Sequence, residues 1–599
     1  MARVILGVSA LYHDAAAALL VDGQVVAAAH EERFTRLKHD PSLPVRAVNW
    51  CLKHAGLSVH EVDQLVFYEK PLRKFERILS TSIAAFPRSG LSFPRQMKSW
   101  LGDKLWTRNR LAETFGLPAA RIGFSEHHLS HAASAFYAAP FARAAVLVAD
   151  GVGEWATTSI WRGGPEGLTQ LAEVRWPHSL GLVYSALTAH LGFAVNEGEY
   201  KVMGMAAWGQ PRYLDQLHQI ARLTPNGGFA LDLDVFSHHW HPTRATTAKL
   251  SALLGPPRRP GSPIALLDPA ADASSRAESQ RHADIAASTQ RWLEDALLHV
   301  ARYAHALTGE DALCLAGGVA LNAVANHRLA AEGPFSQLFV QPAAGDAGGA
   351  LGAAQWAAHA VFGHARPSGA FRVDLGPTID TGHARQLAED LGFPVDEVTG
   401  EDRLAHAVSA DLQAGRAVGF VQGRAELGPR ALGHRSILAD PRGADTAARV
   451  NRQIKLREPF RPFAPSVRAV DLGLFDVPTP ALPLASFMVV ASPAGPRVRG
   501  EAPAVVHVDG TARPQAVDPQ AAPLLHAVLE AQHAATGLGV VLNTSFNLKG
   551  EPLVGSATDA LATLARSGLD AVWIGPLRVG RPSPRTLGPT GADPTESDR

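Results

Sequence analysis

The chain has 599 residues, no net formal charge, 46% hydrophobic residues and 19% charged residues. This length exceeds what one hydrophobic core supports and predicts several domains. Zero net charge gives no electrostatic reason to expect a nucleic-acid or membrane partner, and no apolar run is long enough to span a membrane. The two distant cysteines, Cys51 and Cys314, exclude a disulfide framework and are typical of a reducing compartment. The sequence reaches His13 too early for a signal peptide, so we expect a cytoplasmic protein.

The beginning of the chain predicts a meander of three strands, at 3–9, 15–21 and 24–29. Asp22 and Gly23 form a strong turn signal because both tolerate a positive φ. A loop carrying His13 and Asp14 joins the first two strands. A similar succession of strands returns further along, at 144–149, 157–161 and 168–174. The two meanders predict an internal duplication, with chance similarity as the alternative.

The chain then becomes helical and later returns to α/β elements. We expect a long amphipathic helix, a buried strand and a glycine-rich loop in succession, at 281–307, 312–316 and 317–322. A junction is predicted near 367–369. Beyond it we expect helices at 381–391 and 402–414, then strands at 417–422, 539–543 and 571–575. The last fifteen or so residues, rich in Pro, Gly, Thr and Asp, predict a disordered tail.

A histidine pair gives the first chemical signal. His127 and His131 stand four residues apart, so on a helix both imidazoles would share one face and could bind one metal. A metalloprotease zinc helix would need Glu directly after the first histidine, where this chain has His128. Asp150 and Asp346 each follow an apolar run and are expected at strand ends. The four residues predict a site for iron, manganese or zinc, although the histidine pair alone is equally consistent with a structural role.

Two glycine-rich loops, at 150–154 and 317–322, follow predicted strands. Glycines at such positions let backbone N–H groups approach phosphate oxygens. Neither loop matches the P-loop or the dinucleotide fingerprint, and either could equally be a tight turn.

Cations cluster in the second half of the chain, among glycine, proline and phenylalanine. The segments are 423–435 and 455–465, together with Arg513 and the polar run 543–547. Planar guanidinium groups bind phosphate and carboxylate groups bidentately. The pattern therefore predicts an anion-binding site; a solvated charged face is the alternative.

In these blocks the sequence resembles the NodU/CmcH carbamoyltransferase family. The matching segments occur in the family's order, at 34–39, 127–135, 317–322, 423–433, 460–465 and 543–547. The resemblance covers nearly the whole chain and implies an α/β protein of two domains. Residues 1–368 would form an actin-like (ASKHA), duplicated domain that transfers the carbamoyl group. Residues 369–584 would form a YrdC-like α/β domain that makes a carbamoyl adenylate, followed by a disordered tail at 585–599.

The resemblance also implies roles for individual residues. The expected ligands of Fe²⁺ or another divalent metal are His127, His131, Asp150 and Asp346. His13 would be the base that activates the acceptor hydroxyl. The residues expected around the carbamoyl adenylate are Lys38, Gly151, Val152, Gly153, Glu154, Ser179, Lys201, Gly317, Gly318, Val319 and Asn322. Those expected to hold carbamoyl phosphate and ATP, with Mg²⁺, are Arg430, Lys455, Arg461, Arg513, Asn543 and Ser545.

The implied function is ATP-dependent O-carbamoyl transfer to a small-molecule hydroxyl, as in the tailoring of antibiotics and other natural products, by a monomer or homodimer. An actin-like sugar kinase would use the same glycine-rich loops but would leave the histidine pair and the C-terminal cations unexplained. A tRNA threonylcarbamoyl-type enzyme would share both domains, but zero net charge and no basic patch argue against nucleic acid. A non-catalytic binding protein would not need both sites.

Overall fold

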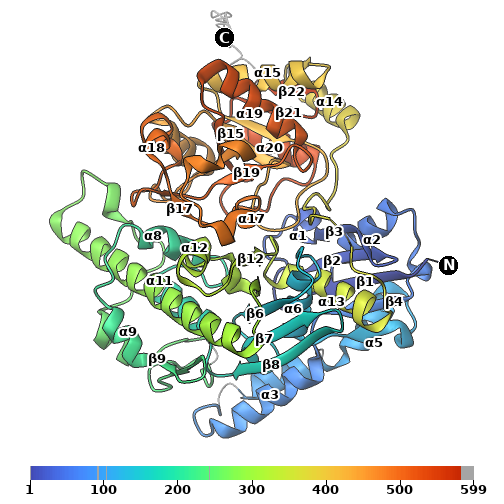
Figure 1. The fold of residues 1–599 in the computed structure, drawn as a ribbon, viewed down its shortest axis with the longest axis vertical. Coiled ribbons are helices and arrows are strands. Elements are labelled where there is room, and N and C mark those ends of the chain that lie inside the picture. The colour runs from blue at the N-terminus through green and yellow to red at the C-terminus, as the bar shows by residue number, and fades with distance from the viewer. Residues whose placement is uncertain (1, 91–92, 103, 242, 368, 582–599) are drawn as a thin grey trace, which may run out of the picture.

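The computed structural model of the protein describes residues 2–90, 93–102, 104–241, 243–367 and 369–581. Figure 1 shows the C-terminal part, yellow to red, above an N-terminal part whose two halves lie side by side. The expected boundary residue Ser368 and the expected tail 585–599 lie outside the described residues.

The N-terminal part contains two five-stranded mixed sheets with the same strand order, β3-β2-β1-β4-β5 and β8-β7-β6-β11-β12. In each sheet the first strand pairs antiparallel with the second and parallel with the fourth. The first sheet comprises β1 (Val4–Ser9), β2 (Ala16–Val21), β3 (Gln24–His30), β4 (Gln64–Phe67) and β5 (Ile122–Phe124). The second comprises β6 (Ala144–Ala149), β7 (Ala156–Gly164), β8 (Gly167–Arg175), β11 (Ala312–Ala316) and β12 (Gln337–Val340). The identical strand order confirms the predicted duplication.

The turn between β2 and β3 has the predicted geometry. Asp22 and Gly23 have φ angles of 51° and 81°. Two positive φ values in a two-residue turn match the twist of the flanking strands.

Helices cover both sheets of the N-terminal part. In chain order, the first eight are α1 (Glu32–Thr35), α2 (Val45–His54), α3 (Pro71–Ala84), α4 (Phe93–Gly102), α5 (Thr107–Phe115), α6 (His127–Phe136), α7 (Leu180–His190) and α8 (Glu199–Ala206). After them come α9 (Leu214–Ile220), the hairpin β9 (Ala221–Thr224) and β10 (Gly228–Leu231), α10 (Ala248–Leu254), α11 (Ala273–Thr308), α12 (Ala323–Glu332) and α13 (Asp346–Trp356). The predicted long helix is therefore α11, which begins eight residues earlier than expected.

Helix α13 packs with unusual closeness between β1 and α6 because its surface is made of small residues. A Cβ on Gly7 of β1 would lie 1.9 Å from the carbonyl oxygen of Ala350, and a Cβ on Gly352 would lie 1.7 Å from that of Ser130. Only glycine fits at such distances. The sequence of α13, rich in Gly and Ala, thereby brings its N-terminal residue Asp346 close to α6 and to the end of β1.

The C-terminal part is built on one eight-stranded sheet of order β13-β22-β21-β14-β15-β20-β16-β19. Its strands are β13 (Val395–Glu397), β14 (Val418–Val421), β15 (Arg435–Ala439), β16 (Ala464–Arg468), β19 (Gln515–Val517), β20 (Val540–Ser545), β21 (Ala571–Ile574) and β22 (Leu577–Gly580). Its helices are α14 (Thr381–Asp390), α15 (Glu401–Gln413), α16 (Thr446–Arg449), α17 (Leu482–Ala485), α18 (Pro496–Glu501), α19 (Pro523–Thr536) and α20 (Ala557–Arg566), with a small hairpin of β17 (Ser492–Pro493) and β18 (Thr511–Ala512). The predicted α/β elements are all present, with ends shifted by one or two residues.

The two parts share hydrophobic cores. Leu484 and Val489 of the C-terminal part pack in the same core as Leu338 of β12, and Leu375 and Leu427 pack with the first sheet. Burial of this kind fixes one docking of the two parts.

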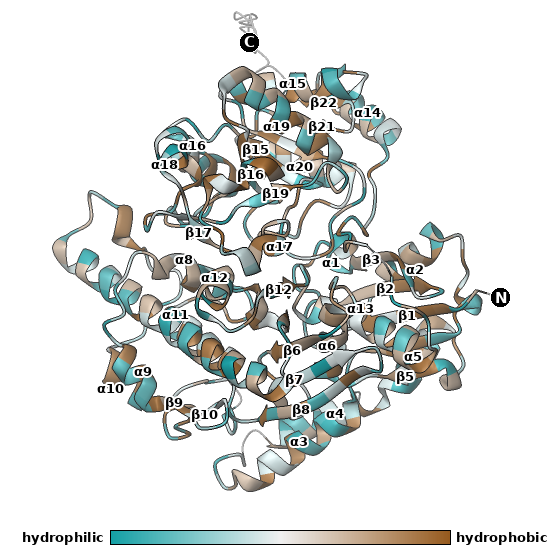
Figure 2. Ribbon diagram, viewed as in Figure 1, coloured by the Kyte–Doolittle hydropathy of each residue, from teal (hydrophilic) through white to brown (hydrophobic). Residues whose placement is uncertain are grey.

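Hydropathy follows this architecture. In Figure 2 the strands of the first sheet are largely hydrophobic, whereas α11 alternates hydrophilic and hydrophobic residues along its length. Among the described residues, no helix combines the length and the apolar character that crossing a bilayer would need.

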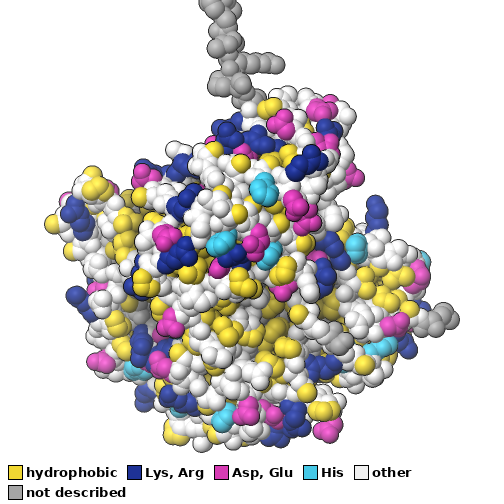
Figure 3. All heavy atoms as spheres, turned by 45° about the horizontal axis from the view of Figure 1, so that its top comes forward, with side chains coloured by type: hydrophobic (Ala, Val, Ile, Leu, Met, Phe, Trp, Pro, Cys, Tyr) yellow, Lys and Arg dark blue, Asp and Glu magenta, His cyan; other side chains and the backbone are white. Residues whose placement is uncertain are grey.

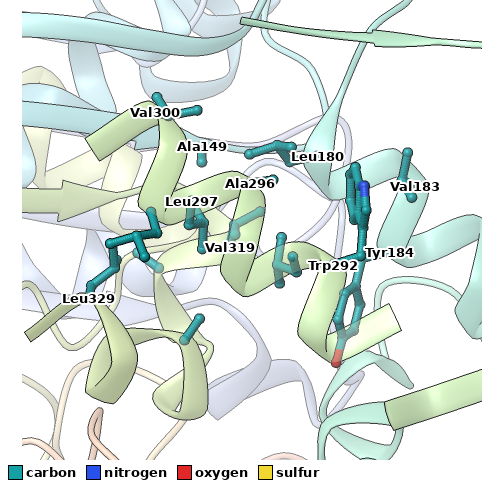
Figure 4. Close-up of a cluster of buried hydrophobic side chains, with 14 of the residues drawn as sticks. Ala149, Leu180, Val183, Tyr184, Trp292, Ala296, Leu297, Val300, Val319 and Leu329 are labelled. Carbon is teal, nitrogen blue, oxygen red and sulfur yellow. The ribbon is translucent and has the colours of Figure 1, made fainter. Parts of the chain in front are cut away.

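Trp292 of α11 anchors the largest core. Its side chain is fully buried, and its indole N–H donates to the carbonyl of Ala221 at 2.8 Å. Figure 4 shows it among Val183, Tyr184 and Leu180 of α7.

We expect Trp292→Ala to lower the free energy of unfolding by about 3–5 kcal/mol, because it leaves a cavity and an unpaired carbonyl. Thermal and urea unfolding would measure the loss; Val470→Ala, at a position 82% exposed, should stay close to the native value.

Candidate active site

Two histidines and two aspartates converge at the centre of the N-terminal part. Nε2 of His127 lies 3.0 Å from Oδ2 of Asp150 and 3.1 Å from Nε2 of His131. Oδ1 of Asp346 lies 3.5 Å from Nε2 of His131. The ligand atoms of all four residues lie within 4.8 Å of one another, and both histidines and Asp346 are buried. The histidine pair lies on α6 with the predicted helical spacing.

Asp346 does not lie at a strand end, as the sequence had suggested, but is the first residue of α13. The chain makes a short loop between β12 and this helix, and the N-terminal end of a helix favours a carboxylate. Asp150 does follow a strand, β6.

Neighbouring groups hold these ligands in place. The carboxylate of Glu154 accepts hydrogen bonds from the backbone N–H groups of His127 (3.0 Å) and Lys70 (2.7 Å), so it caps the first turn of α6. Ser179 donates to the carbonyl of Gly151 at 2.7 Å and thereby fixes the loop after Asp150.

The electrostatics of the cluster are dominated by its carboxylates. Burial opposes protonation of His131, but Asp150 and Asp346 outweigh it and raise its pKa to about 9. Burial likewise opposes ionisation of the two aspartates; His127 and His131 hold the pKa of Asp150 well below its usual range, and His13, His131 and His127 lower that of Asp346. The site is therefore organised around negative charge that favours a cation.

The donor set fits a divalent metal ion. Two imidazole nitrogens face each other at a distance that, in the absence of a cation, requires a shared proton between them. Oδ2 of Asp346 is buried without a hydrogen-bond partner. Imidazole together with carboxylate is a ligand set used for iron, manganese and zinc.

His13 lies in the loop between β1 and β2, beside this cluster. Its Nδ1 lies 2.8 Å from Oδ2 of Asp14, and its Nε2 lies 3.7 Å from Oδ2 of Asp346. Burial would lower the pKa of His13, but Asp346 and Asp14 raise it to about 9. A cation on Asp346 would lower that pKa again, because it would cancel part of the negative charge.

A second cluster, in the C-terminal part, consists of cations. Lys455 donates to the backbone carbonyls of Ser545 (2.6 Å) and Asn547 (2.7 Å). The guanidinium of Arg461 lies 4.6 Å from the centre of the Tyr200 ring, and that of Arg457 lies 4.5 Å from the centre of the Phe463 ring. These partners are neutral, and Glu458 is the acidic side chain that pairs with Lys201 and Arg461, so much of the positive charge remains available to an anion.

Crowding of like charges shifts the pKa values of the side chains in this C-terminal cluster. Burial, together with neighbouring arginines, holds the pKa of Lys455, Arg457 and Arg513 well below the usual ranges. Burial lowers the pKa of Arg430 to about 10. The carboxylate of Glu458 lies 3.2 Å from Lys201 and 3.4 Å from Arg461. Burial would raise its pKa, but a hydrogen bond from its own backbone N–H and these neighbouring cations lower the pKa to about 2. A bound polyphosphate would relieve the remaining repulsion.

Both clusters open into one cavity of about 1030 Å³. The expected residues that line it are His13, Lys38, Asp150, Gly151, Val152, Lys201, Gly318, Val319, Asn322, Asp346, Arg430, Lys455, Arg461, Arg513, Asn543 and Ser545. The side chain of Asn543 also donates to Ser466 (2.9 Å) and Gln515 (3.0 Å), which ties β20 to β16 and β19.

Six of the expected residues lie behind the cavity wall instead. His127 and His131 contact Asp150, with Nε2 atoms 3.0 and 3.7 Å from its Oδ2, and Glu154 and Ser179 make the backbone contacts described above. Gly317 has a φ of 87°, and a Cβ there would lie 2.2 Å from the carbonyl of Ala149. Gly153 packs against the two consecutive histidines at the start of α6.

Several lining residues were not singled out from the sequence. Arg457 and Asn547 stand inside recognised blocks, so their positions carried a signal. His39 and Glu458, also inside recognised blocks, and Asp14, next to His13, line the cavity as well. An acidic side chain among cations gives no sequence signal of its own, because its partners come from other segments.

Comparison with known proteins identifies the family of the chain. A family model described as "Carbamoyltransferase N-terminus" matches residues 4–355, and one described as "Carbamoyltransferase C-terminus" matches residues 409–581. An uncharacterized protein of Synechocystis is 43% identical over 94% of this chain and 95% of its own length. The nodulation protein NolNO of Sinorhizobium fredii is 37% identical over 94% of this chain and 78% of its own. The 3'-hydroxymethylcephem-O-carbamoyltransferase of Amycolatopsis lactamdurans is 37% identical over 44% of this chain and 48% of its own.

The two matched segments and the relatives make the protein a transferase enzyme. The chain belongs to the carbamoyltransferase family, of the NodU/CmcH type, as the sequence motifs had indicated.

We expect the purified protein to hold close to one equivalent of a divalent metal and His127→Ala to lose most of it, because the variant removes one of four converging donors. Elemental analysis by mass spectrometry measures this. His128→Asn is the matched control: His128 is the next residue of α6, and its Nδ1 contacts the Ser159 hydroxyl at 2.7 Å instead of the cluster. Full metal occupancy in His127→Ala would contradict the assignment.

Proposed function

We propose that the protein is an ATP-dependent O-carbamoyltransferase that activates carbamoyl phosphate in its C-terminal part and transfers the carbamoyl group in its N-terminal part. The observation that supports this most strongly is the single cavity, which joins a concentrated cation cluster to a His/Asp metal-type cluster with a histidine beside it. The proposed domains are 1–368, actin-like, and 369–584, YrdC-like.

The C-terminal cations suit adenylate formation. Carbamoyl phosphate and water give carbamate and phosphate; a carbamate oxygen then attacks the α-phosphorus of ATP, and pyrophosphate leaves. Arg430, Lys455, Arg461 and Arg513 would neutralise the phosphate charges, with Ser545 and Asn543 beside them and Mg²⁺ on the polyphosphate. Carbamate is a poor acyl donor, whereas its anhydride with AMP has a good leaving group.

The N-terminal residues suit the transfer step. The loops 150–154 and 317–322 with Lys38, Ser179 and Lys201 would surround the adenylate. His13 would take the proton of the acceptor hydroxyl, whose oxygen attacks the carbamoyl carbon, and AMP leaves with the bond electrons. Iron or another divalent metal on His127, His131, Asp150 and Asp346 would supply Lewis-acid polarisation when bound.

The acceptor is proposed to be a small molecule with a free hydroxyl, by analogy with the relative that acts on a 3'-hydroxymethylcephem. A natural product or sugar fits a cavity of this size. The tRNA-modifying alternative is disfavoured, because acidic and basic side chains are interspersed over the face drawn in Figure 3 and form no basic stripe there.

The scheme divides the half-reactions between two sites. We expect Arg461→Ala to reduce carbamoyl-phosphate-dependent pyrophosphate release by about 100-fold or more, since it removes a charged donor from the anion site. His13→Ala should keep that release and lose about 100-fold or more of acceptor carbamoylation. Arg497→Ala, a surface variant paired with Glu501, is the control. Equal loss of pyrophosphate release in both variants would refute two sites.

The shared cores and single cavity also support internal passage of the adenylate. The anhydride is sensitive to water, and an enclosed route protects it. We therefore expect a mixture of His13→Ala and Arg461→Ala proteins to show little transfer, although each has one intact site. Radiolabelled carbamoyl transfer in the mixture measures this. Recovery towards the wild-type rate as protein concentration rises would indicate release into solution instead.

A further inference from the structure

The loop that carries His13 is joined to the segment that carries His39. Two backbone hydrogen bonds, of 2.8 and 2.9 Å, connect residues 11 and 15 to residues 41 and 40. Asp14 and His39 both have left-handed backbone conformations, with φ angles of 53° and 57°. Such conformations cost free energy in non-glycine residues, and they persist where surrounding structure fixes them, often at functional sites.

The Asp14 carboxylate lies between two imidazoles. Nδ1 of His39 lies 2.6 Å from Oδ1 of Asp14, and Nδ1 of His13 lies 2.8 Å from Oδ2. Although burial opposes ionisation of Asp14, the two histidines hold its pKa far below the usual range. An ionised carboxylate only accepts, so both Nδ1 atoms carry hydrogen. The free lone pair of a neutral His13 is then on Nε2, the atom that faces Asp346 and the metal-type cluster.

The same residues do not form a second cation site. Ligand atoms of Asp14, Glu32 and His39 lie within 4.8 Å of one another. However, both oxygens of Asp14 already accept imidazole N–H groups. The oxygens of Glu32 accept from the Arg33 guanidinium (3.0 Å) and from the backbone N–H of His39 (2.9 Å). A cation placed here would face donated hydrogens, so the arrangement is a chain of hydrogen bonds.

We propose that Asp14 and His39 are positioning residues: Asp14 fixes the tautomer and orientation of the His13 ring, and His39 fixes Asp14. The inference rests on the proposed function, in which Nε2 of His13 takes the acceptor proton. Asp14 keeps its charge throughout and stabilises the imidazolium that forms. A ring held in the productive orientation avoids the loss of rotational freedom during the reaction.

The segment that carries His39 is also anchored to the C-terminal part. Arg36, three residues before His39, donates to the carbonyls of Leu553 (2.5 Å) and Pro552 (3.0 Å) and pairs with Asp559 at 3.1 Å. The segment that holds Asp14 is therefore fixed by the interface between the two parts, and the orientation of His13 depends on their docking.

Single variants test the roles first. We expect Asp14→Ala to lower kcat for acceptor carbamoylation about 100-fold and His39→Ala about 10-fold, with the KM for the acceptor, the metal content and pyrophosphate release unchanged. His39→Asn should recover part of the loss, because its amide can donate to Asp14. If Asp14→Ala does not fold, Asp14→Asn replaces it; one amide oxygen cannot accept both N–H groups, and a loss of about 10-fold is expected. His54→Asn, on the exposed end of α2, is the control.

A double variant separates positioning from general structural damage. In a His13→Ala background, adding Asp14→Ala should cause no further loss of kcat, because Asp14 acts through His13. A further loss of about 100-fold, or a wild-type kcat for Asp14→Ala alone, would overturn the inference. If His13→Ala itself carbamoylates the acceptor at the wild-type rate, the proposed role of His13 has failed and the inference fails with it.

Discussion

The active site depends on one close contact, the packing of α13 between β1 and α6. Gly7 and Gly352 let the backbones approach to distances that any Cβ would prevent. This contact brings together three segments: the loop after β1 with His13, the start of α6 with His127, and the start of α13 with Asp346. Larger side chains at the glycines would separate His13 from the metal-type cluster, even if all four residues of the cluster were kept.

A second constraint is electrostatic and opposite in sign at the two ends of the cavity. The metal-type cluster gathers carboxylates that raise the pKa of His131 and His13 to about 9, whereas the C-terminal cluster gathers cations whose pKa values are lowered. One end therefore favours a bound divalent cation and the other a bound polyphosphate. Folding places both ends in one cavity, through which the proposed adenylate would pass.

Much of the fold was predictable because local signals and fold agree. Asp22 and Gly23 predicted a hairpin, and the spacing of His127 and His131 predicted that both lie on one face of a helix. The position of Asp346 was predicted wrongly, at a strand end, since an apolar run followed by glycines does not reveal the short loop before α13. Asp14 and His39 could not be paired from sequence, because their contact depends on how two distant loops meet. The proposed adenylate-forming role of the C-terminal part rests on the motifs and the cation cluster.

The central claim is that one cavity couples activation of carbamoyl phosphate to transfer onto a hydroxyl. The most direct measurement is nucleotide consumption by the purified protein, followed by chromatography of its products. The account predicts that ATP is converted to AMP and pyrophosphate only when carbamoyl phosphate is present. Conversion of ATP to ADP, or consumption of ATP that does not depend on carbamoyl phosphate, would contradict it.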